Sequence, residues 1–71
     1  MDAKLINDAF LNGWTVEVWR TYIPSFGDNL FADEIMGSGK IMKHTAFDIM
    51  LDDGQYYPKA GAELRIRQKN R

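Results

Sequence analysis

Alternation of apolar and polar residues in the second half of the chain constrains the fold more than any other feature. It runs through residues 40–51, and Asp53-Gly54 follows. Period-two alternation is typical of a half-buried strand, and an Asp-Gly pair favours a tight hairpin turn because it tolerates positive φ. Residues 55–57 then predict a return strand, and a second turn leads to a last strand over 62–69. This half therefore predicts an antiparallel sheet.

The first half predicts one helix and one strand. Asp2 can cap a helix whose apolar residues recur at a spacing of three and four, and Asn12-Gly13 can end it. Residues 14–23 are rich in β-branched and aromatic side chains and predict a strand. Pro24 should end this strand, because proline has no N–H to donate to a ladder.

Residues 29–36 fit either a short helix or a strand, because so short a segment does not reveal its period. We favour the strand. Gly37-Ser38-Gly39 would then be a hairpin loop leading into residues 40–51.

Seventy-one residues are enough for only one domain. A helix followed by short antiparallel strands cannot remain an open ribbon, because the apolar face of the sheet must be covered. We predict a single small α+β domain over residues 1–71, with the N-terminal helix packed on a curled antiparallel sheet of four to five strands.

Residues 37–67 also carry a resemblance to a known family. They contain a glycine-rich turn, a strand, Leu51-Asp52-Asp53-Gly54, an aromatic return strand and a basic last strand. This order is similar to the central hairpin of SH3-like small barrels of the Tudor or KOW type. The resemblance implies that the curled sheet closes as a small SH3-like barrel.

The charges are unevenly distributed along the chain. Residues 1–39 contain two cationic and six acidic side chains, whereas residues 40–71 contain seven and four. This asymmetry predicts a basic side that could meet an anionic partner. An alternative is that the two halves attract each other within the fold.

The chain offers little for catalysis or metal binding. It contains no cysteine and one histidine, His44, so a structural zinc site is not expected. No nucleophile, base and orienting group stand in a recognised arrangement. Asp52 and Asp53 are explained by the turn that they precede. We expect a protein that is not an enzyme and binds no cofactor and no metal.

The basic C-terminal strand is the first candidate site. Arg65, Arg67 and Lys69 recur at every second residue and would point the same way, about 6.6 Å apart. This spacing is close to that of successive phosphates along a nucleic-acid strand. The alternative is a solvated face that protects a sheet edge. The predicted nucleic-acid-binding residues are Lys43, Lys59, Arg65, Arg67, Lys69, Tyr56 and Tyr57, with the tyrosines stacking on bases.

A protein-binding inhibitor or adaptor of phage or mobile-element type is the second hypothesis. The chain has more large apolar side chains than a small core can cover, and an uncovered aromatic patch would meet a host protein. The segment 44–48 is similar to part of the phage uracil-DNA glycosylase inhibitors. The candidate residues are Trp19, Tyr22, Phe26, Phe31, Asp33 and Glu34.

Other expectations concern assembly and location. The sequence contains no apolar run long enough to span a membrane. Self-association through an open strand edge is a further alternative. The lack of cysteine is compatible with a reducing cytoplasm, so we expect a cytoplasmic protein whose partner is a nucleic acid or another protein.

Overall fold

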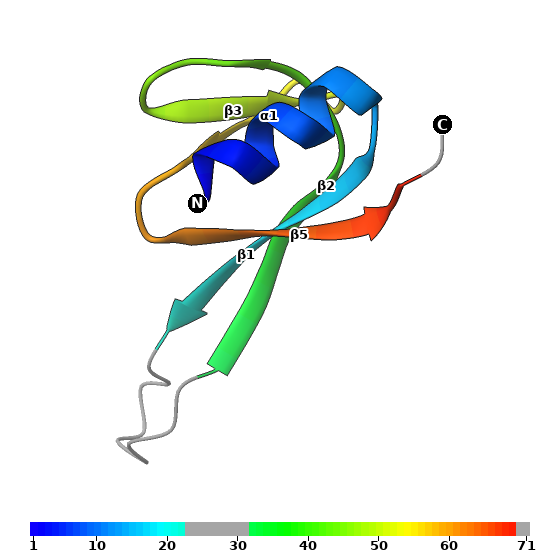
Figure 1. Ribbon diagram of the computed structural model, residues 1–71. Helices are drawn as coiled ribbons and strands as arrows, with labels where there is room; N and C mark the ends of the chain where they lie inside the picture. The colour runs from blue at the N-terminus through cyan, green and yellow to red at the C-terminus, as the bar shows by residue number, and fades with distance from the viewer. Residues whose placement is uncertain (23–31, 70–71) are drawn as a thin grey trace.

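A computed structural model describes residues 1–22 and 32–69 (Figure 1). One helix precedes a five-stranded antiparallel sheet with strand order β4-β3-β2-β1-β5. The prediction of a small α+β domain with an N-terminal helix on a curled antiparallel sheet is confirmed. The elements are α1 (Ala3–Asn12), β1 (Thr15–Tyr22), β2 (Ala32–His44), β3 (Asp48–Leu51), β4 (Tyr56–Pro58) and β5 (Ala62–Gln68).

Helix α1 begins and ends where its capping residues predict. The Asp2 carboxylate accepts a hydrogen bond from the Lys4 N–H at 2.9 Å, which satisfies one free donor of the first turn. Gly13 has a left-handed backbone with φ 66°, and its N–H donates to the last turn. The Trp14 N–H also donates to the Ala9 carbonyl at 3.0 Å, completing a Schellman motif. These local signals are sufficient to place the helix.

Strand β2 connects the two parts of the sheet. Its first part, residues 32–40, pairs with β1, and its last residues pair with β3. Gly37 and Gly39 lie within the strand, so the prediction of a hairpin loop at Gly37-Ser38-Gly39 is wrong. The segment 32–36 is a strand as predicted, and residues 29–31 lie outside the described part of the chain.

The two glycines let the β3–β4 hairpin close onto β2. A Cβ at Gly37 would overlap the Tyr57 hydroxyl and lie 2.6 Å from its ring carbon Cζ. A Cβ at Gly39 would overlap the Asp52 carboxylate, and its φ of 147° is also unfavourable for other residues. Tyr57 then donates a hydrogen bond to Asp53 at 2.7 Å. Close packing of side chains on bare backbone therefore explains both glycines.

A turn divides the segment 40–51, so the prediction of one continuous strand there is wrong. β2 ends at His44 and β3 begins at Asp48. The Thr45 hydroxyl accepts from the Phe47 and Asp48 N–H groups at 3.2 and 3.1 Å and donates to the Asp48 carboxylate at 2.7 Å. A side chain that satisfies nearby backbone donors competes with the strand ladder, and the alternating pattern did not reveal this.

The remaining turns and strands agree with the sequence. Gly54 and Gly61 have φ of 80° and 74° in the turns before β4 and β5. β4 includes Pro58, which lies at an edge of the sheet, where a residue without an N–H is tolerated. β1 is one residue shorter at its start than predicted, and Ile23 lies outside the described residues.

The core lies between α1 and the concave side of the sheet. α1 packs against β2 and β5. The last residues of β1, 19–22, and their partners in β2, 32–35, extend away from the helix as a two-stranded arm (Figure 1). Phe10 is 37% exposed near the end of the helix. The buried side chains are Ile6, Ala9, Val16, Val18, Ile41, Ile49, Leu51, Tyr57 and Leu64.

Gly37→Ala tests the close packing of the β3–β4 hairpin on β2. We expect it to lower the free energy of unfolding by about 1–3 kcal/mol, because the new methyl group displaces the Tyr57 ring. Chemical denaturation measures this change. In a Tyr57→Leu background the same substitution should cost clearly less, because the overlapping ring atoms are gone. Equal costs in the two backgrounds would contradict the packing explanation.

Candidate nucleic-acid interface

The outer face of the β2-β1-β5 sheet holds most of the charged candidates. In β1, buried Val16 and Val18 alternate with Glu17 and Trp19, which face away from the core. Glu17 lies between Ser38 of β2 and Arg65 of β5 in the strand register. The central position of β1 therefore brings side chains from β2 and β5 within reach of one another.

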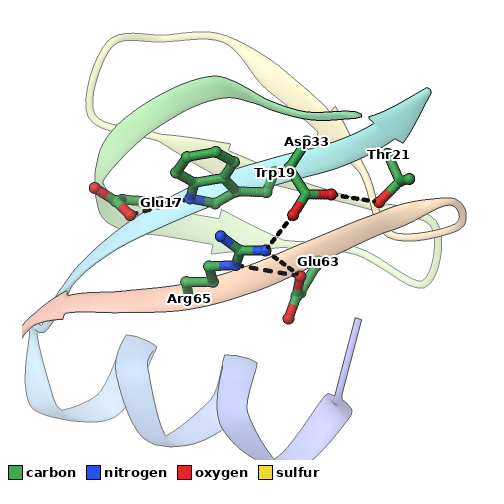
Figure 2. Close-up of polar contacts among 6 residues, drawn as sticks. All are labelled: Glu17, Trp19, Thr21, Asp33, Glu63 and Arg65. Atoms are coloured by element: carbon green, nitrogen blue, oxygen red, sulfur yellow. Dashed lines mark hydrogen bonds and ion pairs between the residues drawn. The ribbon is translucent and has the colours of Figure 1, made fainter. Parts of the chain in front are cut away.

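Arg65 lies at the centre of one half of this face (Figure 2). Its guanidinium carbon is 4.4 Å from the centroid of the Trp19 ring, which is a cation–π contact. Its Nη2 atom is 3.1 Å from a carboxylate oxygen of Asp33 and 3.0 Å from one of Glu63. The charge of Arg65 is thus balanced within the protein. We call Arg65, Trp19, Asp33 and Glu63 the Arg65 cluster.

Two neighbouring hydrogen bonds hold the Arg65 cluster in place. The Thr21 hydroxyl donates to Asp33 at 2.8 Å, and the Trp19 indole N–H donates to Glu17 at 3.0 Å (Figure 2). The Thr21 hydrogen bond, followed by that of Arg65, holds the pKa of the Asp33 carboxyl below its ordinary value. Hydrogen bonds that Arg65 donates to Glu63 and Asp33 raise the pKa of its guanidinium. With Glu17, three carboxylates surround one cation, so this half of the face is acidic.

The opposite end of these three strands is basic. Arg67 Nη1 lies 3.4 Å from the Ser38 hydroxyl, and Lys69 Nζ lies 5.1 Å from the centroid of the Trp14 ring. Lys40 is exposed on β2 at the register position of Thr15. Among residues 1–22 and 32–69, these three cations form no salt bridge. We call Lys40, Arg67 and Lys69 the basic end.

A β-bulge interrupts the predicted row of cations. Thr15 pairs with Gln68 and Val16 with Ile66, so Arg67 is the extra residue of β5. The predicted alternation from Arg65 to Lys69 is therefore wrong, because Gln68 takes the position beside Thr15 and Lys69 lies against Trp14, which packs on the core.

The other predicted nucleic-acid-binding residues lie elsewhere. Tyr57 is buried in the core, so its ring offers no stacking surface. The hydrogen bond to Asp53, followed by burial, raises the pKa of its hydroxyl. Lys43 lies over the exposed Tyr56 ring at 5.4 Å, and a hydrogen bond with Tyr56 raises the lysine pKa. This pair spans β2 to β4, at the opposite edge of the sheet from β5. Lys59 is half-buried in the turn before β5.

Sequence reasoning missed Lys40, Ser38 and Trp14 as companions of the C-terminal cations. Their proximity depends on the register of β1 with β2 and β5, which no local pattern in the chain reveals. It also missed the pairing of Arg65 with Asp33, which are 32 residues apart. The opposite charges of the two halves of the chain were the only sign in the sequence that such a pairing forms.

The residues predicted to bind a protein are also dispersed. Trp19 is half-buried beneath Arg65, Tyr22 is exposed on the arm, and Asp33 belongs to the Arg65 cluster. Glu34 accepts two hydrogen bonds from Arg20, at 3.0 and 2.9 Å. Phe26 and Phe31 lie outside the described residues.

The described part of the chain contains no pocket and no group of three or more side chains suited to a metal ion. Its candidate sites are therefore surfaces. None of its helices has the length and apolar character needed to cross a membrane. No family model, curated protein or solved structure matches the chain.

The titration of Asp33 tests the geometry of the Arg65 cluster. Its pKa should lie below 3.8, and Thr21→Val or Arg65→Gln should raise it, because each removes a donor to the carboxylate. NMR of the carboxyl group measures this. Arg20→Gln is the control, because Arg20 pairs with Glu34 instead. An Asp33 midpoint that is unchanged by Thr21→Val would contradict the arrangement.

The depressed pKa also predicts a pH dependence of stability. An aspartate with a lowered folded-state pKa stabilises the fold above its unfolded-state pKa, near 3.8. This contribution is lost as pH falls through the folded-state pKa. The free energy of unfolding of Asp33→Asn should therefore fall less on acidification than that of the unsubstituted protein.

Proposed function

We propose that this protein is a small non-enzymatic module that binds nucleic acid through the basic end of its β2-β1-β5 sheet. The observation that carries the proposal is the contrast along β5. Arg65 is neutralised by carboxylates, whereas Arg67 and Lys69 form no salt bridge within the described residues and lie on the same part of the fold as Lys40. Cations that are not paired within the protein remain available to phosphates.

The dimensions of the basic end suit a single strand of nucleic acid. Lys40 and Gln68 flank Thr15, so their strands are separated by two strand spacings, roughly 10 Å. Arg67 and the Ser38 hydroxyl lie across this width, and both can donate to a phosphate. Trp14 provides an aromatic ring next to Lys69 on which an unpaired base can stack.

The strand order supports the further proposal that the sheet closes as a small SH3-like barrel. Consecutive strands β1 to β4 are neighbours, and β5 returns to pair with β1. The strong bend of β2 between its two partners is what closure requires. We also propose a cytoplasmic location, with which the absence of cysteine is compatible.

Charge removal at the basic end tests the proposed function. Arg67→Gln and Lys69→Gln should each weaken binding of a labelled single-stranded oligonucleotide roughly three- to tenfold at low ionic strength. With three phosphate contacts, log K should fall against log salt with a slope of about −2. Fluorescence anisotropy measures both quantities.

Lys4→Gln is the matched control, because Lys4 has the same charge but lies on α1, paired with Asp8. It should leave the affinity nearly unchanged. Absence of binding at low salt, or an equal effect of Lys4→Gln, would overturn the proposal. Parallel titrations with DNA and RNA oligonucleotides identify which nucleic acid is bound.

A protein-binding role is the second candidate, and the arm favours it. The arm extends beyond the helix-covered body, and its Tyr22 and Ile35 are 44% and 45% exposed (Figure 1). Ile35 is the register partner of Trp19, whereas Tyr22 pairs with Ala32 and lies on the opposite face, so the arm carries an exposed apolar side chain on each face. An exposed apolar surface on an extended hairpin suits insertion into a host-protein groove, as an inhibitor or adaptor of phage type would do.

Nuclease-treated affinity capture distinguishes the two roles. If the arm binds a protein, one partner should remain after nuclease treatment and be lost with Ile35→Ser. Phe47→Ser is the control, because Phe47 is also exposed but lies in the turn between β2 and β3. Loss of the partner with both variants, or capture that depends on nucleic acid, would count against an arm-specific role.

A further inference from the structure

The Arg65 cluster is an unexpected feature on a face proposed to bind phosphates. Arg65 is the first cation of the row that continues with Arg67 and Lys69. Its Nε atom donates to Glu63 at 3.2 Å, and its Nη2 atom donates to Glu63 at 3.0 Å and to Asp33 at 3.1 Å. Two of the three guanidinium nitrogens are therefore already occupied by carboxylates.

The surrounding charge strengthens this block. Asp33 and Glu63 together outweigh the single charge of Arg65, and Glu17 adds a third carboxylate beside Trp19. A phosphate approaching Arg65 must displace these carboxylates or tolerate their repulsion. The cation–π contact with Trp19 further limits movement of the guanidinium.

We infer that Asp33 and Glu63 mask Arg65, which means that their pairing with its guanidinium keeps it from binding phosphates. The protein then has one cation fewer for a polyanion, and its affinity is limited. The inference rests on the proposed function, because masking has a consequence only if the row binds nucleic acid. Asp33 belongs to the arm, whereas Arg65 belongs to the strand at the edge of the sheet. A ligand or partner that draws these carboxylates away would add Arg65 to the three cations of the basic end.

Masking also couples the arm to the nucleic-acid site. A polyanion that engages Arg65 competes with Asp33, and anything that binds Asp33 favours polyanion binding by the same factor. The Thr21 hydrogen bond to Asp33 opposes release, because it holds the carboxylate in its masking position. The arm would thus regulate how many cations are available to bind a polyanion.

The neighbouring residue Glu34 provides a matched control. Asp33 and Glu34 are adjacent in β2, both are exposed, and each pairs with an arginine. Strand alternation directs them to opposite faces, and Glu34 pairs with Arg20 instead of Arg65. Asp33→Asn and Glu34→Gln therefore change the net charge equally and each remove one exposed ion pair, but only the first removes a carboxylate that masks Arg65.

The decisive experiment measures binding of a labelled single-stranded oligothymidylate by anisotropy over a range of salt concentrations. Asp33→Asn should bind roughly three- to tenfold tighter than the unsubstituted protein, with a salt slope steeper by about 0.7. Glu34→Gln should change the affinity by about twofold or less. Circular dichroism confirms that each variant is folded.

The double variant Asp33→Asn/Arg65→Gln shows whether the gain passes through Arg65. Compared with Arg65→Gln alone, the added Asp33→Asn should give a much smaller gain than it gives in the unsubstituted protein. An equal gain in both backgrounds, or equal effects of Asp33→Asn and Glu34→Gln, would overturn masking and leave the proposed function standing. Failure of the unsubstituted protein to bind at low salt would overturn the proposed function itself, whether or not Asp33→Asn binds.

Discussion

The passage of β2 from one partner strand to another is the constraint on which the rest of the structure depends. The strand pairs with β1 up to Lys40 and with β3 from Ile41, and two bare glycine positions let the β3–β4 hairpin approach its backbone. Tyr57 then fills the space above Gly37 and becomes part of the core. Because one strand serves both parts of the sheet, a single core forms beneath one short helix.

This construction also creates the candidate site. With β2 and β5 on its two sides, β1 becomes the centre of an outward face whose side chains come from distant parts of the chain. The same register brings three carboxylates around Arg65 at one end and leaves Lys40 and Arg67 at the other. The two ends therefore differ in charge because of the strand order. The cations themselves are evenly spaced in the sequence, which gives no sign of this difference.

Sequence reasoning succeeded where the signal is local. Asp2, Gly13, Gly54 and Gly61 predicted the ends of α1 and two turns, since each meets a need of its own backbone. It failed at the glycine-rich segment of β2, because the need for glycine there is created by Tyr57 and Asp52, which follow more than ten residues later. For the site, Arg67 and Lys69 were found from their spacing, but the neutralisation of Arg65 was not.

The sequence by itself determined the helix, most of the strands, the α+β class and the concentration of cations in the second half of the chain. These properties follow from backbone preferences and from the period of apolar residues, which act over a few positions. Only the tertiary structure decided which of those cations stay free, because neutralisation of Arg65 requires Asp33 to approach from a strand 32 residues away. Coulomb attraction depends on distance in space, and the register of three strands sets that distance.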